Sequence, residues 1–276
     1  PVDVPIVGDI KLALQTMTHQ WEEKQLILDH KGLQCWWEGI EQWRGRKSLS
    51  YLDDERIIKP QYVIESLAQL TRNRAYIASD VGQHQMFVAQ YYPFEKSRQW
   101  FNSGGLGTMG VGLPYAMGAQ LALPQETIFC VTGDGSIQMN IQELSTCYQF
   151  KLPIKIINLN NQYLGMVRQW QEFYYEGRYS HTYMDSLPDF VKLAQAYGHV
   201  GMRIEKKADV LPALKEAIAL QDQLVFMDFI TSQEQNVYPM VGNGKGLDEM
   251  LLPPHMRHSA QDSEVFDAKN KHYDTR

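Results

Sequence analysis

Two apolar runs in the middle of the chain, at 127–132 and 154–159, each end in a polar motif. Runs of this length and composition predict buried β-strands. Gly133-Asp134-Gly135 follows the first run directly, and Asn160-Asn161 follows the second. In open α/β sheets, ligands bind at the carboxyl edge of parallel strands. We therefore expect both motifs at one edge of one sheet, which restricts the chain to the α/β class.

The residue types at these two strand ends suit a diphosphate that is bridged by a hard divalent cation. Such a cation takes oxygen ligands, so we expect the Asp134 carboxylate, the Asn161 side-chain carbonyl and a nearby backbone carbonyl to bind it. Gly133 and Gly135 allow the backbone to approach the diphosphate, and Ser136 offers an amide and a hydroxyl. Gly-Asp-Gly alone is a weak signal, so the prediction depends on the pairing of the two motifs.

The rest of the chain extends this alternation of strands and helices. Asn140 followed by Glu143 predicts a capping box for a helix over 141–150. The pattern as a whole indicates a mostly parallel sheet with helices on both faces, preceded by a short helical arm over 10–29 and 36–47. Further strands are expected at 75–79, 200–204 and 224–230, and further helices at 60–70, 83–91, 108–123, 164–174, 189–197 and 209–220.

Composition excludes several classes of function. The net charge is −6 and the basic residues are scattered, which gives no reason to expect a nucleic-acid partner. No apolar run approaches the length of a membrane span, and no signal-peptide pattern is seen, so no membrane partner is expected. The three cysteines are irregularly spaced and indicate neither a disulfide framework nor a zinc site. A reducing, cytoplasmic location is the natural interpretation.

Three further segments carry a family resemblance. They are Asp-Val-Gly-Gln-His-Gln-Met at 80–86, Ser-Gly-Gly-Leu-Gly-Thr-Met-Gly at 103–110 and Asn-Asn-Gln-Tyr-Leu-Gly-Met-Val-Arg-Gln-Trp at 160–170. Together with the paired strand-end motifs, they resemble the large catalytic subunit of acetohydroxyacid synthase, also called acetolactate synthase. The similarity runs from about residue 1 to about residue 250.

The resemblance implies thiamin diphosphate and Mg²⁺ as cofactors, with FAD in the full-length enzyme. The backbone carbonyl of Tyr163 would join Asp134 and Asn161 as a metal ligand. Met166, Val167 and Trp170 would line the substrate channel, although helical spacing of this kind usually means core packing. The residues implied to bind the cofactor are Gly82, Gln83, His84, Gly107, Met109, Gly133, Asp134, Gly135, Ser136, Asn161, Leu164, Gly165 and Met166.

Two local features are given other interpretations. The segment 105–110 satisfies G-x-G-x-x-G, but 98–103 does not read as the buried strand that a dinucleotide site requires. In the family this segment would contact the pyrimidine ring of the cofactor instead. Arg168 and the aromatic residues 173–175 are interpreted most simply as surface and packing residues.

The implied activity is that of a carboligase in branched-chain amino-acid biosynthesis. It decarboxylates pyruvate and joins the two-carbon unit to a second 2-ketoacid, either pyruvate or 2-ketobutyrate. A homo-oligomer and a regulatory small subunit are the implied protein partners. Rival interpretations are another enzyme of the superfamily, such as pyruvate oxidase, glyoxylate carboligase or a 2-ketoacid decarboxylase, and a non-catalytic assembly module.

The resemblance covers only part of such a subunit. Residues 1–55 would end the central domain and connect it to a diphosphate-binding domain at 56–252, with a C-terminal tail at 253–276. The activating glutamate of the family belongs to an N-terminal domain, usually of the neighbouring subunit, so no catalytic residue is assigned in this chain. The isolated chain is therefore expected to be inactive.

Overall fold

The structure is a computed structural model that describes residues 2–256, so most of the predicted tail at 253–276 lies outside the described residues. The chain forms two compact units that divide between Ser48 and Leu49. No helix among residues 2–256 has both the length and the apolar character needed to cross a membrane.

The first unit consists of two helices, α1 (Ile10–Glu23) and α2 (His30–Gly45). Each begins at an aspartate whose side chain accepts a hydrogen bond from a backbone N–H of the first turn, at 3.0 Å for Asp9 and 2.9 Å for Asp29. The cap at Asp29 explains why the second helix begins before the predicted residue 36. Neither helix contains a buried residue.

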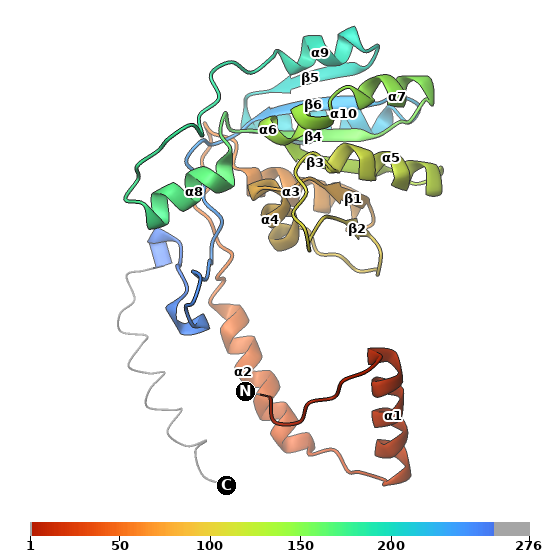
Figure 1. Cartoon of the computed structure of the whole chain (residues 1–276), viewed down its shortest axis with the longest axis vertical. Helices are drawn as coiled ribbons and strands as arrows, with labels where there is room; N and C mark the ends of the chain where they lie inside the picture. The colour runs from red at the N-terminus through yellow and green to blue at the C-terminus, as the bar shows by residue number, and fades with distance from the viewer. Residues whose placement is uncertain (1, 257–276) are drawn as a thin grey trace. The chain divides into compact units, whose positions relative to one another are not determined.

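The second unit is built on a parallel sheet of six strands in the order β2-β1-β3-β4-β6-β5 (Figure 1). This sheet confirms the predicted α/β class. The short outer strand β2 was not predicted from the sequence. The strands are β1 (Tyr76–Ser79), β2 (Trp100–Phe101), β3 (Ile128–Gly133), β4 (Lys155–Asn160), β5 (Val200–Ile204) and β6 (Val225–Ile230).

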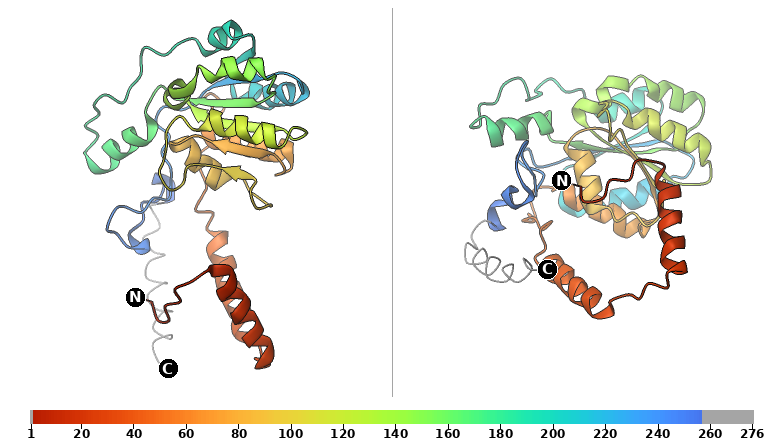
Figure 2. Two further views of the ribbon diagram at one scale, coloured as in Figure 1. Left: turned by 45° about the vertical axis from the view of Figure 1, so that its right-hand side comes forward. Right: turned by 60° about the horizontal axis from the view of Figure 1, so that its bottom comes forward.

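Helices cover both faces of the sheet, as Figures 1 and 2 show. One face packs against α3 (Pro60–Thr71), α4 (Gln83–Tyr91) and α10 (Lys207–Ala219). The other face packs against α5 (Gly112–Ala122), α7 (Glu143–Gln149) and α9 (Phe190–Ala196).

Side chains of the central strands alternate between these two faces. In β3, Phe129 and Val131 belong to the first hydrophobic cluster, whereas Ile128 and Cys130 belong to the second. Every residue of β3 and β4 is buried, as expected for strands that are covered by helices on both sides. The carboxyl ends of these strands are thereby held in a rigid frame.

Short elements follow the strand ends and reach toward one edge of the sheet. The single-turn helix α6 (Asp134–Ile137) and the 3₁₀ turn η1 (Gln138–Asn140) follow β3, and α8 (Gly165–Tyr174) follows β4. Two further 3₁₀ turns, η2 (Leu247–Glu249) and η3 (Pro254–Met256), lie near the end of the described chain.

Two further predictions about helix starts, both in the second unit, are wrong. The helix predicted over 108–123 begins only at Gly112, because a buried carboxylate holds the preceding loop. The capping box is also absent. Asn140 Nδ2 donates instead to the carbonyl of Gly110 at 2.8 Å, and α7 begins at Glu143 without a side-chain cap. In both places a partner that is distant in sequence replaces the local signal.

Candidate functional site

A cavity lies at the carboxyl edge of the sheet. Its walls come mainly from the segments that follow four adjacent strands, β1, β3, β4 and β6. This is the edge at which open α/β sheets bind ligands. The two strand-end motifs of the sequence meet here, as their register at the ends of β3 and β4 requires.

Asp134 is the first residue of α6 and leaves only 2% of its surface exposed. Its carboxylate accepts hydrogen bonds from the backbone N–H of Gln162 at 2.6 Å and of Gly135 at 2.9 Å. Burial raises the pKa of Asp134 to about 7, although these hydrogen bonds act in the opposite direction. A bound cation would favour the ionised form that burial disfavours.

Asn161 stands beside Asp134 in the tight turn after β4. Its Oδ1 accepts from the N–H of Tyr163 at 3.1 Å, and its Nδ2 donates to Gln83 Oε1 at 3.3 Å. Gln162 adopts a left-handed backbone with φ of 59°, which is uncommon for a residue with a side chain. Its hydrogen bond to Asp134 ties this turn to the carboxylate, and Asn161 and Tyr163 line the same cavity.

The side chains that could act as metal ligands restrict which metal ions the cavity could bind. Within residues 2–256, no group of three or more His, Cys, Asp or Glu side chains could hold an ion. Asp134 is the acidic residue that lines the cavity, so a cation there would depend on one carboxylate with amide and backbone oxygens, completed by ligand atoms. This is the donor set of Mg²⁺ when it is bound to a phosphate group.

His84 contributes a polar atom that lacks a partner. Its Nε2 is buried and has no hydrogen bond within the described part of the chain. Burial lowers the pKa of His84 to about 4, opposed by Asp80, so the ring is neutral at pH 7. A Cβ at Gly82 or Gly133 would lie 2.7 or 2.9 Å from this ring. The two glycines therefore leave room for an imidazole whose free nitrogen can bind an anionic ligand.

Asp80 has a structural role that the sequence motif at 80–86 does not reveal. It follows β1 directly and is fully buried. Its Oδ1 accepts from the N–H of Gly110 at 2.7 Å, and its Oδ2 accepts from the N–H of Gly112 at 3.2 Å and from Thr132 Oγ1 at 3.3 Å. The carboxylate thus ties the loop that carries Met109 to the ends of β1 and β3. Its position after a strand, with a glycine-rich segment downstream, is the signal that could have identified it.

The structure brings most of the predicted site residues together and leaves two outside the cavity. Gly107 lies in a turn with φ of 61° whose N–H donates to the carbonyl of Ser103 at 2.9 Å, and it does not line the cavity. Trp170 is also outside. The cavity lining includes Gly82, Gln83, His84, Met109, Gly133, Asp134, Gly135, Ser136, Asn161, Tyr163, Leu164, Gly165, Met166 and Val167.

Trp170 lines a neighbouring surface depression instead. Met166 and Val167 belong to both hollows, which makes α8 the wall between them. Trp170 keeps 36% of its surface exposed and meets the ring of Tyr174 edge-on at 5.3 Å. It therefore does not belong to the core of this unit.

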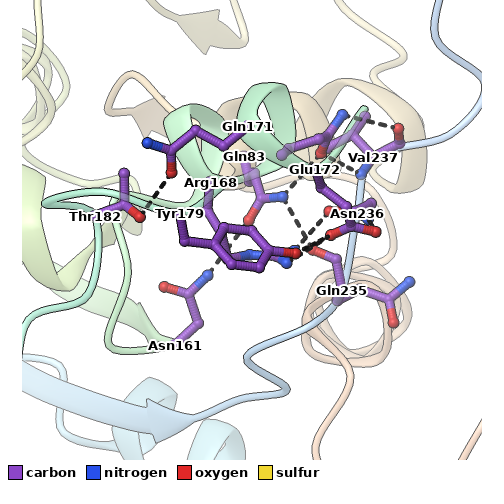
Figure 3. Close-up of polar contacts among 11 residues, drawn as sticks. Gln83, Asn161, Arg168, Gln171, Glu172, Tyr179, Thr182, Gln235, Asn236 and Val237 are labelled. Atoms are coloured by element: carbon purple, nitrogen blue, oxygen red, sulfur yellow. Dashed lines mark hydrogen bonds and ion pairs between the residues drawn. The ribbon is translucent and has the colours of Figure 1, made fainter. Parts of the chain in front are cut away.

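The interpretation of Arg168 as a surface residue is wrong. Only 4% of its side chain is exposed, and it donates to Glu172 at 2.7 Å and to Asn236 at 2.6 Å (Figure 3). Asn236 in turn donates to Glu172 at 2.8 Å, which closes a triangle. The segment after β6 covers this side of α8, and nothing local to the helix predicts that cover.

Comparison with known proteins agrees with this geometry. Residues 80–229 match the family described as thiamine pyrophosphate enzyme, C-terminal TPP binding domain. The chain is 54% identical over 252 residues to the acetolactate synthase isozyme 3 large subunit of Escherichia coli, which covers 91% of this chain and 44% of that protein.

Other relatives give a similar picture. The acetolactate synthase large subunits of Haemophilus influenzae and Cyanidium caldarium are 50% and 42% identical over 252 and 247 residues. These alignments cover 91% and 89% of this chain but only 44% and 42% of the relatives. The chain therefore spans somewhat less than half the length of the curated relatives that it matches.

Proposed function

Since the chain belongs to the family of thiamine pyrophosphate enzymes, we propose that the cavity at its sheet edge holds the diphosphate of thiamin diphosphate together with Mg²⁺. The observation that carries this proposal is the buried Asp134 carboxylate beside Asn161, at the ends of two adjacent parallel strands. Asp134, Asn161 and the carbonyl of Tyr163 would bind the cation. The unpartnered His84 Nε2 and the glycine-lined wall would accommodate the phosphate oxygens.

We further propose that the intact protein is an acetolactate synthase. The identity of about half of the aligned positions with acetolactate synthase large subunits supports this activity. When bound, the cofactor supplies an electron sink for the decarboxylation of a 2-ketoacid. The residues of this chain would bind the cofactor, hold its orientation through the loop that carries Met109, and shape the acceptor site with α8.

Further components of the proposed enzyme would lie outside this chain. We propose FAD as a further cofactor, a homo-oligomer with a regulatory small subunit as the assembly, and an N-terminal domain of the neighbouring subunit as the source of the activating glutamate. The partial coverage of the relatives is consistent with such additional parts.

A product assay tests the proposed reaction. The intact protein, supplied with pyruvate, thiamin diphosphate and Mg²⁺, is expected to form acetolactate, which chromatography separates from acetaldehyde and acetate. Acetaldehyde as the main product would indicate a decarboxylase, and acetate would indicate an oxidase. Either result would contradict the carboligase proposal while leaving the cofactor site intact. Absence of any turnover, despite bound cofactor, would favour the assembly module.

The acceptor site gives a second expectation. We expect Trp170→Leu to leave the affinity for thiamin diphosphate nearly unchanged while lowering the preference for 2-ketobutyrate over pyruvate. A change of about 1–3 kcal/mol is the scale for one methylene in an apolar pocket. The measurement is the ratio of the two products when both ketoacids compete.

A suitable control for this substitution is Tyr148→Leu, which removes an aromatic ring that is 61% exposed on α7. The control is expected to leave the product ratio unchanged. If Trp170→Leu also leaves the ratio unchanged, the depression beside α8 does not select the acceptor.

A further inference from the structure

Gln169 is fully buried on α8, one position before Trp170, and all of its hydrogen-bonding capacity is directed inward. Its Oε1 accepts from the N–H of Val237 at 2.7 Å and from Gln83 Nε2 at 2.9 Å. Its Nε2 donates to the carbonyl of Val237 at 3.2 Å and to the sulfur of Met240 at 3.1 Å. The residue therefore joins the segment after β6 to the wall of the cavity.

These contacts leave Gln169 only one amide orientation. The backbone N–H of Val237 can only donate a hydrogen bond, and its carbonyl can only accept one. Exchanging the oxygen and nitrogen of Gln169 would therefore place a donor against a donor and an acceptor against an acceptor. The oxygen of Gln169 must then face Gln83, which presents its Nε2. The carbonyl of Gln235 accepts from the same Nε2 at 2.9 Å and enforces the same orientation.

The orientation is passed on to Asn161. With Nε2 of Gln83 turned toward Gln169, its Oε1 faces Asn161 and accepts from Nδ2 at 3.3 Å (Figure 3). The nitrogen of the Asn161 amide is thereby held against Gln83, and its oxygen is held on the side of Tyr163. An amide that turned over would present N–H groups where a cation requires an oxygen.

We propose that Gln169 is a positioning residue which, through Gln83 and together with the Gln235 carbonyl, holds the oxygen of Asn161 as the atom presented to the bound cation. This inference rests on the proposed function, because it takes Asn161 as a metal ligand. Partners of metal ligands act in this way on ligand orientation and metal affinity. Gln83 and Asn161 separate Gln169 from the proposed cation site.

The chain provides a control for a merely structural role. Arg168, Glu172 and Asn236 also fasten α8 to the segment after β6, through hydrogen bonds of 2.6 to 2.8 Å. This triangle makes no hydrogen bond to Gln83 or Asn161. Removing only the Asn236 side chain is therefore expected to loosen the same attachment of the helix while keeping the backbone groups of Gln235 and Val237 that orient the amides.

The experiment is calorimetric titration of the intact protein with thiamin diphosphate in the presence of Mg²⁺. Gln169→Met keeps the length of the side chain but removes the acceptor for Gln83, and it is expected to weaken binding about 10- to 100-fold. Asn236→Ala is expected to bind as the parent does. Equal losses in the two variants, or no loss in Gln169→Met, would overturn the inference.

A second substitution separates orientation from packing. Both ends of a carboxylate accept, so an aspartate at 161 has no wrong orientation. Because the added carboxylate also attracts the cation, Asn161→Asp alone is the reference. Adding Gln169→Met to Asn161→Asp is expected to cost much less affinity than adding it to the parent. If the two losses are equal, the loss did not come from amide orientation and the inference is wrong.

Two further outcomes are also decisive. If circular dichroism shows that Gln169→Met is unfolded, Gln169→Glu takes its place, because it keeps an acceptor for Gln83 and for the N–H of Val237. A loss of affinity of about 10- to 100-fold in folded Gln169→Glu would oppose the inference, because the acceptor that orients Gln83 is still present. A parent protein that binds no thiamin diphosphate would refute the proposed function itself, whereas normal binding by both parent and Gln169→Met refutes only the role of Gln169.

Discussion

Asp134→Ala is expected to weaken the binding of thiamin diphosphate with Mg²⁺ by at least about 100-fold, more than the loss expected for a residue that only supports a ligand. The site offers a single carboxylate to the cation, and within the described residues no other acidic cluster can replace it. Calorimetry of the intact protein measures the affinity directly. Asp209→Ala, which removes the same charge from an exposed position in the first turn of α10, is the matched control.

The protonation of Asp134 adds a pH dependence to this expectation. Burial raises its pKa to about 7, so the group becomes protonated as the pH falls below 7, and the proton competes with the cation. Affinity for Mg²⁺ is therefore expected to decrease from pH 7.5 to pH 6, by up to about tenfold for each pH unit below the pKa.

If Asp134→Ala binds thiamin diphosphate and Mg²⁺ as tightly as the parent does, the cation is bound elsewhere.

Asp80→Ala is expected to produce the largest loss of stability among substitutions at the site. The fully buried carboxylate accepts from the N–H groups of Gly110 and Gly112 and from Thr132. Each buried donor that loses its acceptor costs about 1–3 kcal/mol, so the N–H groups of Gly110 and Gly112 alone give about 2–6 kcal/mol. Urea-induced unfolding, monitored by circular dichroism, provides the free energy of unfolding.

Asp80→Asn tests whether the loss of stability in Asp80→Ala comes from the lost hydrogen-bond acceptors. The asparagine oxygen can still accept from one of the two N–H groups, so its loss of stability is expected to be smaller than that of Asp80→Ala. If Asp80→Ala unfolds at the same urea concentration as the parent, the loop that carries Met109 does not depend on this carboxylate.

The strand ends could be predicted because their signal is local. The apolar runs before Gly133 and Asn160 report burial on both faces of the sheet, and the polar motifs that follow identify the ligand-binding edge. The same reasoning placed Asp134 and Asn161 at one edge of the sheet, and both residues line the cavity at that edge. Their roles as metal ligands remain predictions.

The parts that could not be predicted depend on partners that are distant in sequence. Arg168 has the spacing of an exposed helical residue, but the chain around Asn236 covers it. Asn140 has a good local partner in Glu143, yet a carbonyl 30 residues earlier takes its donor. The start of α5 is shifted by Asp80, which follows β1 and lies 32 residues before Gly112. In each case a buried polar group is satisfied across the fold, and single-sequence patterns carry no record of such pairings.

The strand order has a consequence for how the protein acquires its site. The cavity wall after β1 belongs to an early part of the unit and the wall after β6 to a late part, and β3 and β4 separate them in the sheet. Contacts between segments so far apart along the chain form slowly during folding. The cavity is complete only when all of the central strands have paired, so a ligand that binds there discriminates against every partly folded state. Such a ligand would stabilise the whole sheet by mass action, because it binds only after the last central strand has paired.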